Sequence, residues 1–456
     1  MDKKTNSQPP VAEPAADGPR AILALAIPAL GSLVIEPLLI LIDSVMVGHL
    51  GVVPLAGLSL ASTVLNTLVG IFVFLAYSTT ATTARHFGAG RRTEGLQAGI
   101  QALWLAAGLG LLLVLLLELT APWLVTALGA DAATAPAAVS YLRAAAPGMV
   151  GMLVLLAGNG VLRGLLDTRT PLYVLAAGAV INVALNFLFI YGLNWGLVGA
   201  GIGLSIAQTL MAAAMVLVVI RKSRGVPWRP TRGGVFSSFG QGLPLLIRTV
   251  SLRVALLITV VVATRAGTVA LAAQQVVNSL WTMASFALDA LAIAAQSLVA
   301  VALGARRPVR ALILRLSKWG VLAALAFGVV FAAASPLLPH LFGTDPAMHH
   351  AATGALIAAG VLMPIGGLVF ILDGVLIGAG ENRYLAVAGV GTLVLYLPAL
   401  GALLWWVQNN APLDDQSQAT LLLWLWIAFA GWFMLVRAVA NGVKAHSLLE
   451  IDTQNR

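Results

Sequence analysis

The chain has 456 residues, of which 60% are hydrophobic and only 9% are charged. Soluble domains are about 45–50% apolar and about 25% charged, so this composition excludes a soluble protein and indicates a polytopic membrane protein. The net charge of +9 fits basic cytoplasmic loops better than a nucleic-acid surface. The absence of cysteine excludes disulfides and thiolate metal sites.

Hydrophobic runs along the chain predict twelve membrane-spanning helices, because one span needs about 20 apolar residues. Residues 1–20 precede the first run and are rich in Pro, Ala and polar residues, which predicts a disordered tail. The spans are predicted at 22–46, 55–84, 95–118, 136–160, 170–191, 197–221, 240–264, 269–300, 309–334, 350–378, 384–407 and 419–441.

Lys and Arg gather in the two terminal segments and in the loops that follow even-numbered spans, and Arg265 is the clear exception. Because cytoplasmic loops collect these residues, we expect both termini in the cytoplasm. The predicted location is a bacterial-type plasma (inner) membrane, crossed many times.

The chain also repeats itself. At an offset of 216 residues Pro28 matches Pro244 and Gly51 matches Gly267, and at an offset of 214 Gly160 matches Gly374. Each half holds six spans, so the two halves are parallel repeats. The predicted fold is all-α, with twelve transmembrane helices in two pseudo-symmetric six-helix lobes. Its parts are a cytoplasmic tail (1–20), an N-lobe (21–221), a linker (222–239), a C-lobe (240–441) and a second cytoplasmic tail (442–456).

Asp43, inside the first span, is the leading candidate for ion coupling. A charged residue at mid-span costs roughly 2.5–3.5 kcal/mol on insertion scales, so such residues mark functional sites by default. A low-dielectric site favours the protonated carboxyl, which suits a proton carrier. Glu36 lies two helical turns earlier on the same face, beside the helix-kinking Pro37. The alternatives are a carboxylate held by fixed hydrogen bonds for Asp43 and a plain hydrogen-bond partner for Glu36.

Asn182 and Asn186 are four residues apart in the fifth span and therefore share one face, which we expect to point into the bundle. Asn159 in the fourth span and Gln208 in the sixth are further candidates. Ordinary hydrogen bonds between helices, worth about 0.6 kcal/mol on average, are the alternative for all of these amides.

The second half holds the intramembrane acids Asp289 and Asp373, together with Arg248 and Arg253 in span 7. We expect either acid to pair with Arg253, in a role that is structural rather than functional. Arg248 is predicted to extend to the cytoplasmic interface.

Three segments resemble signatures of the multidrug and toxic compound extrusion (MATE) transporters. Ile42–Gly51 with Pro54–Gly57 is similar to the family's first-span motif. Gly88–Arg91 and its repeat Gly304–Arg307 resemble the turns after spans 2 and 8, and Arg163–Arg169 resembles the loop after span 4. Ala287–Ala290 resembles the DinF-like branch.

This resemblance implies a cation-driven antiporter that exports amphipathic, often cationic compounds from a chamber between two lobes. Asp43 matches the family's proposed proton carrier, with Asn182, Asn186 and Asn159 as its polar partners. Because Asn186 stands where other branches carry an acid, a proton is expected rather than Na⁺. Asp373 matches one acid of a sodium site known in some members, but span 7 has arginines where the second acid is needed.

The competing functions are a flippase for a lipid-linked precursor and a polytopic membrane transferase. The flippase would need several cationic cavity residues to hold phosphates, and the transferase would need a large loop or a cluster of His, Asp and Arg. The chain has no Walker loop, dinucleotide motif or metal-spaced cluster, which predicts no enzyme activity, no cofactor and no bound metal. The expected partners are small amphipathic drug-like molecules and membrane lipids, without nucleic acid, and the expected state is a monomer.

Overall fold

The computed structural model describes residues 18–410 and 412–454, so most of the predicted N-terminal tail lies outside the described residues. Within these ranges the chain is almost entirely helical. The helices are α1 (Pro19–Gly48), α2 (Val52–Phe72), α3 (Phe74–Gly88), α4 (Arg92–Ala127), α5 (Ala135–Ala145), α6 (Gly148–Gly164), α7 (Arg169–Asn186), α8 (Gly196–Lys222), α9 (Arg232–Ala266), α10 (Thr268–Gly304), α11 (Arg310–Ala334), α12 (Pro346–Ala379), α13 (Asn382–Asn410), α14 (Asp415–Trp426) and α15 (Met434–Gln454), with the short helices η1 (Phe187–Gly192), η2 (Leu338–Leu341) and η3 (Ile427–Phe433).

The predicted number of spans is confirmed. In the described part of the chain, eleven helical stretches are long and apolar enough to cross a membrane, and α5 with α6 forms a twelfth that bends by 52°. Pro147 lies at this bend, where it cannot donate a backbone hydrogen bond. The last stretch, Asp415–Leu449, extends well beyond the span end predicted at 441. Much of the predicted tail 442–456 is therefore helical.

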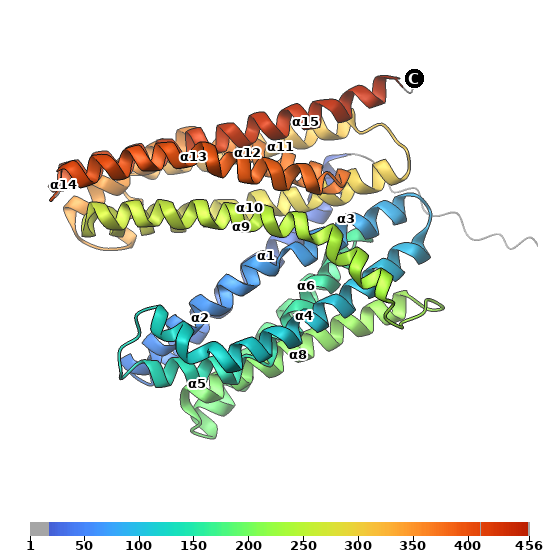
Figure 1. The fold of residues 1–456 in the computed structure, drawn as a ribbon, viewed down its shortest axis with the longest axis horizontal. Helices are drawn as coiled ribbons and strands as arrows, with labels where there is room; N and C mark the ends of the chain where they lie inside the picture. The colour runs from blue at the N-terminus through green and yellow to red at the C-terminus, as the bar shows by residue number, and fades with distance from the viewer. Residues whose placement is uncertain (1–17, 411, 455–456) are drawn as a thin grey trace, which may run out of the picture.

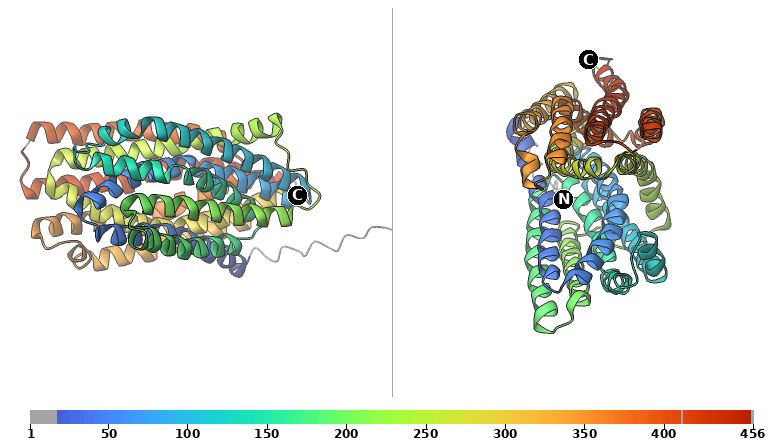
Figure 2. Two further views of the ribbon diagram at one scale, coloured as in Figure 1. Left: turned by 90° about the horizontal axis from the view of Figure 1, so that it is seen from below. Right: turned by 90° about the vertical axis from the view of Figure 1, so that its left-hand side faces the viewer.

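The helices form two bundles, and the long axes of most of them share one direction (Figure 2). The N-lobe contains α1–α8 and the C-lobe contains α9–α15. Figure 1 shows the bundles meeting at the right-hand end and diverging toward the left. We define the arginine-rich end as the end that carries Arg85, Arg91, Arg306 and Arg307.

The two lobes touch most closely at the arginine-rich end, through glycines that are repeat counterparts. A Cβ added to Gly88 at the end of α3 would overlap the backbone of Val301, and one added to Gly304 would overlap the backbone of Arg85. Val301 is itself the counterpart of Arg85 at the offset of 216 residues. The contact between α3 and α10 is therefore pseudo-symmetric and needs residues without side chains.

The first and seventh spans cross between the lobes. Ile22 and Leu25 at the start of α1 are buried in an apolar cluster with Leu291 and Leu312 of the C-lobe. Conversely, Gly242 in the first half of α9 lies against Phe74 of the N-lobe. Each lobe thus sends one helical arm into the other.

The connection between the lobes is shorter than predicted. Helix α9 begins at Arg232, inside the predicted linker 222–239. Its N-terminus is attached to the N-lobe, because the backbone N–H of Thr231 donates to Oε1 of Gln101 at 2.9 Å. Only a short stretch after Lys222 is therefore non-helical.

The turns that follow the two crossing spans repeat the same backbone geometry. Gly51 between α1 and α2 has φ of 121°, and its counterpart Gly267 between α9 and α10 has φ of 142°. L-residues with side chains rarely adopt this region, so glycine is needed at both positions.

Candidate functional site

The N-lobe site joins α1 to α7 through one carboxylate and two amides. Nδ2 of Asn186 donates to Oδ1 of Asp43 at 2.7 Å and lies 3.4 Å from Oδ1 of Asn182. All three side chains are buried, with Asp43 8% exposed and Asn186 fully enclosed. The predicted shared face of Asn182 and Asn186 is confirmed, and it points at the first-span acid. The role of these residues in coupling stays a prediction.

A small cavity of about 80 Å³, which we call the N-lobe cavity, lies beside this site and is lined by both first-span acids. Asp43, Glu36 and Gln208 all line it, along with Tyr141 and Met152. Glu36 is exposed whereas Asp43 is buried. The cavity therefore joins the acids that the sequence places on one face of the helix.

Unused hydrogen-bonding capacity lies near Asp43 and in the cavity wall. Nδ2 of Asn182, Oδ1 of Asn186 and Oε1 of Gln208 are buried and find no partner among the described residues. Buried polar atoms are nearly always satisfied, so Gln208, which lines the cavity, indicates a place there for water or a transported species.

Asn159 does not join this group. It is buried in α6, but it is not among the residues that line the Asp43 cavity. Met152 does line the cavity, and Asn159 lies seven residues further along the same helix, or about 10 Å. At the repeat offset of 214 residues Asn159 corresponds to Asp373.

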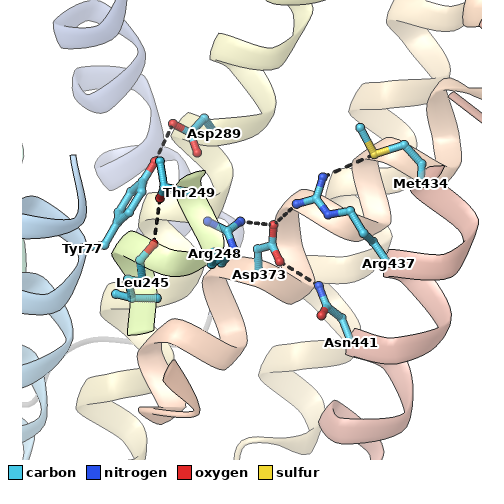
Figure 3. Close-up of polar contacts among 9 residues, drawn as sticks. All are labelled: Tyr77, Leu245, Arg248, Thr249, Asp289, Asp373, Met434, Arg437 and Asn441. Atoms are coloured by element: carbon cyan, nitrogen blue, oxygen red, sulfur yellow. Dashed lines mark hydrogen bonds and ion pairs between the residues drawn. The ribbon is translucent and has the colours of Figure 1, made fainter. Parts of the chain in front are cut away.

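The C-lobe holds Asp373 in a cluster of three cationic and polar side chains (Figure 3). Arg248 and Arg437 both donate to Oδ2 of Asp373, and Nδ2 of Asn441 donates to Oδ1 at 2.7 Å. The side chains of Asp373 and the two arginines are 9–11% exposed. One carboxylate thus accepts from three buried donors.

This cluster corrects two sequence-based predictions. Asp373 pairs with Arg248 and Arg437 rather than with Arg253, and Arg248 lies inside the protein rather than at the interface. Arg248 turns inward because α9 packs between the lobes, where Asp373 offers a buried partner. Arg437 and Asn441 lie in the last predicted span, 419–441, but neither was predicted as a partner of Asp373, to which α15 brings both.

Asp289 forms a contact between the lobes. Oη of Tyr77 in α3 donates to Oδ2 of Asp289 in α10 at 3.3 Å (Figure 3). In addition, Nε2 of Gln296 donates to the carbonyl of Tyr77 at 2.6 Å. The predicted pairing of Asp289 with Arg253 is therefore also wrong. Tyr77 was missed from the sequence, although it is a phenol within a long apolar span.

A larger cavity of about 330 Å³, which we call the C-lobe cavity, lies between these C-lobe groups and the N-lobe helix α2. Its charged lining residues are Arg248, Arg253, Arg437, Asp289 and Asp373. Arg253 is exposed, and its guanidinium lies against Gly70 of α2, where an added Cβ would overlap it. Arg253 has no hydrogen-bond or ion-pair partner among the described residues.

The repeat shows that the two lobes carry different chemistry on one scaffold. The counterpart of Asp43 is Thr259, and the counterpart of Asn182 is Tyr396. Oγ1 of Thr259 lies 3.0 Å from Oη of Tyr396, so the equivalent helix pair is joined here by two neutral hydroxyls. The coupling carboxylate predicted from the sequence therefore has no equivalent at the matching C-lobe position.

Two six-span lobes, joined at one end and enclosing polar cavities between and within them, define a multi-pass membrane transporter. The model of the MatE family matches residues 28–188 and 244–400, one segment in each lobe. The chain belongs to the MatE family, whose members are transporters and not enzymes.

Curated relatives come from plants and bacteria. Protein DETOXIFICATION 44, chloroplastic, of Arabidopsis thaliana is 30% identical over 380 residues, covering 80% of this chain and 73% of the relative. DNA damage-inducible protein F of Escherichia coli (strain K12) is 29% identical over 423 residues, covering 89% and 92%. The DinF-like branch named from the sequence agrees with this second relative.

A solved structure confirms the fold. It is described as the outward-facing conformation of a multidrug resistance MATE family transporter of the MOP superfamily. It aligns with a TM-score of 0.81 at 20% identity, covering 94% of this chain and 97% of the other.

Proposed function

We propose that this protein is a proton-coupled antiporter that exports amphipathic drug-like compounds by alternating access. The observation that carries the proposal is the buried Asp43 carboxylate, which lines a small cavity and accepts a hydrogen bond from Asn186. A carboxyl in such a site can bind and release a proton, and its surroundings change when it does.

The donor set around Asp43 favours H⁺ over Na⁺. Asn186 presents its NH₂ group to Asp43, and a donor in that position competes with a bound cation for the carboxylate oxygen. The C-lobe offers no better cation site, because Asp373 is occupied by Arg248 and Arg437. A bound Na⁺ would need several oxygen ligands around Asp43, whereas a proton needs only the carboxylate itself.

The arrangement of the lobes supports an outward-open state. The lobes touch at the arginine-rich end, and arginine-rich loops collect on the cytoplasmic side. With this orientation both termini lie in the cytoplasm and the cavities are open toward the outside. The bacterial relative favours a location in a plasma membrane, and one chain holds both lobes, so a monomer suffices.

The names of the similar proteins support cargo of the detoxification type. A plant relative is named for detoxification, and the solved structure is that of a multidrug resistance transporter. A lipid-precursor flippase is less well supported, because two of the three cavity arginines are already bound to Asp373. Membrane lipids remain expected neighbours of the spans.

The test is export of a fluorescent cationic dye from liposomes that contain the purified protein. A pH gradient is imposed with and without Na⁺, for wild type, Asp43→Asn and the matched control Asp415→Asn, an exposed acid at the start of α14. We expect transport that follows the pH gradient, that is lost in Asp43→Asn and that is retained in the control. Wild-type export by Asp43→Asn would refute the assignment, and a strict need for Na⁺ would refute proton coupling.

A further inference from the structure

We propose that the C-lobe cavity binds an amphipathic organic anion, whose carboxylate, sulfonate or phosphate is held by the guanidinium of Arg253. The inference deepens the proposed function, since it names a cargo class for the same transporter. It differs from the expectation of mainly cationic cargo that follows from the sequence.

The charge inventory of the cavity carries the first step. Asp373 accepts from Arg248, Arg437 and Asn441, so its charge is already neutralised. Asp289 is engaged by Tyr77 from the other lobe. Asp373 is therefore not free to bind a cationic cargo, and Asp289 is already held in the contact between the lobes.

Arg253 is the arginine of the cavity lining that is not bound to Asp373. Among residues 18–410 and 412–454 it has no acid within ion-pair distance, and arginine stays protonated at any physiological pH. Three arginines and two carboxylates line the cavity, which leaves one uncompensated positive charge when both acids are ionised. An exposed, unpaired guanidinium on the wall of a cavity is suited to bidentate binding of a carboxylate or phosphate.

The space around Arg253 suits the apolar part of such a molecule. Gly70, on the opposite lobe, leaves room for the guanidinium where any side chain would collide with it. Trp281, Phe429 and Phe433 line the same cavity, with ring centroids of successive pairs 5.5 Å apart. An aromatic wall beside one fixed charge is the usual pattern of a small-molecule site.

The cavities of the two lobes then carry opposite charges and suit different species. The N-lobe cavity contains the acids Glu36 and Asp43, whereas the unpaired charge of the C-lobe cavity is positive. An anion at Arg253 and a proton at Asp43 do not compete for one group.

The experiment is equilibrium dialysis of two probes against the full chain in lipid nanodiscs, with empty nanodiscs subtracted. The probes are 1-naphthaleneacetate and its uncharged analogue 1-naphthaleneacetamide, which share one ring system. The variants are Arg253→Gln, Arg253→Lys and the matched control Arg265→Gln. Arg265 is exposed, lies on the same helix and is not part of the cavity lining. Thermal unfolding confirms that each variant is folded.

Wild type should bind the carboxylate about 10- to 100-fold more tightly than the amide, as a charge-assisted bidentate contact implies. Arg253→Gln should abolish this preference, Arg253→Lys should keep part of it, and Arg265→Gln should keep all of it. Equal binding of the two probes by wild type, or an unchanged preference in Arg253→Gln, would overturn the proposal.

The same binding assay on Asp43→Asn separates this inference from the proposed function. The preference for the carboxylate should persist in that variant, because Asp43 does not line the C-lobe cavity. If Asp43→Asn exports normally but Arg253→Gln loses the preference, proton coupling at Asp43 fails and the anion site stands. If the reverse holds, the anion site alone fails.

Discussion

Substitution of Asp373 by Asn should destabilise the protein strongly, because it removes the carboxylate to which two buried arginines are bound. The change leaves Arg248 and Arg437, each 11% exposed, without a counter-ion and close to one another. Removing one partner from a buried ion pair costs about 3–5 kcal/mol. If the C-lobe unfolds as a unit of about 200 residues, this corresponds to a fall in melting temperature of roughly 6–20 °C on the scale of soluble domains.

The informative comparison is Arg437→Met, which removes a positive charge from the same cluster where Asp373→Asn removes the negative charge. This variant leaves Arg248 and Asp373 as a balanced pair and removes the surplus positive charge. It loses one hydrogen bond to Asp373 and the contact of the guanidinium with the ring of Phe433, 5.6 Å from the centroid. We expect a cost of at most about 2 kcal/mol.

Both variants are measured as purified protein in one detergent, by the temperature at which half of the sample leaves the monodisperse peak. Asp43→Asn serves as a third sample. There Asn186 can still donate to the carbonyl of the new amide, so stability should change little although export is lost. A melting temperature for Asp373→Asn equal to that of Arg437→Met would show that the charge of Asp373 does not hold the cluster together.

Tyr77→Phe removes the hydrogen bond to Asp289 between the lobes and should shift the conformational equilibrium away from this state by about 2- to 10-fold. Spin labels on cysteines introduced at the N-terminus of α2 and the C-terminus of α9 measure this, and an unchanged distance distribution would contradict it. Burial tends to raise the pKa of Asp167, but bonds from Thr170 and Lys222 lower it below its ordinary value. The ionised Asp167 therefore contributes its full share to the stability of the folded protein above about pH 4, and this contribution is lost as the pH falls further. Asp167→Asn should have a lower melting temperature than wild type at pH 7. Its melting temperature should also fall less steeply as the pH is lowered below about 4. The same pH dependence in both proteins would refute this.

The parts of the fold that depend on local pattern were predictable. Apolar run lengths indicate the spans, and the turn glycines Gly51 and Gly267 stand at matching positions because each repeat needs the same backbone turn. Asn182 and Asn186 were placed together by their spacing alone, and Asp43 by the cost of a charge in a span. The hydrogen bond from Asn186 to Asp43 then brings the residues chosen by these two rules together in one site.

The contacts that were missed join segments far apart in the chain. Asp373 binds Arg248 and Arg437, which lie on the seventh and last spans, and hydropathy does not say which helices are neighbours. Arg437 lies within the span predicted at 419–441, but nothing in the local pattern indicates that it faces Asp373. One signal was present, since Arg437 and Asn441 show the same spacing of four residues as Asn182 and Asn186.

The exchanged arms of α1 and α9 have a consequence for biosynthesis. The start of α1 reaches its lasting partners, Leu291 and Leu312, only after roughly 270 further residues have been made, which takes about 14–54 s at usual translation rates. The start of α9 emerges when Phe74 and Gln101 are already in place. Two arms that are equivalent in the finished molecule are thus unequal during synthesis. The start of α1 lacks its C-lobe partners until they are synthesised, whereas the start of α9 can pack against the N-lobe as soon as it is synthesised.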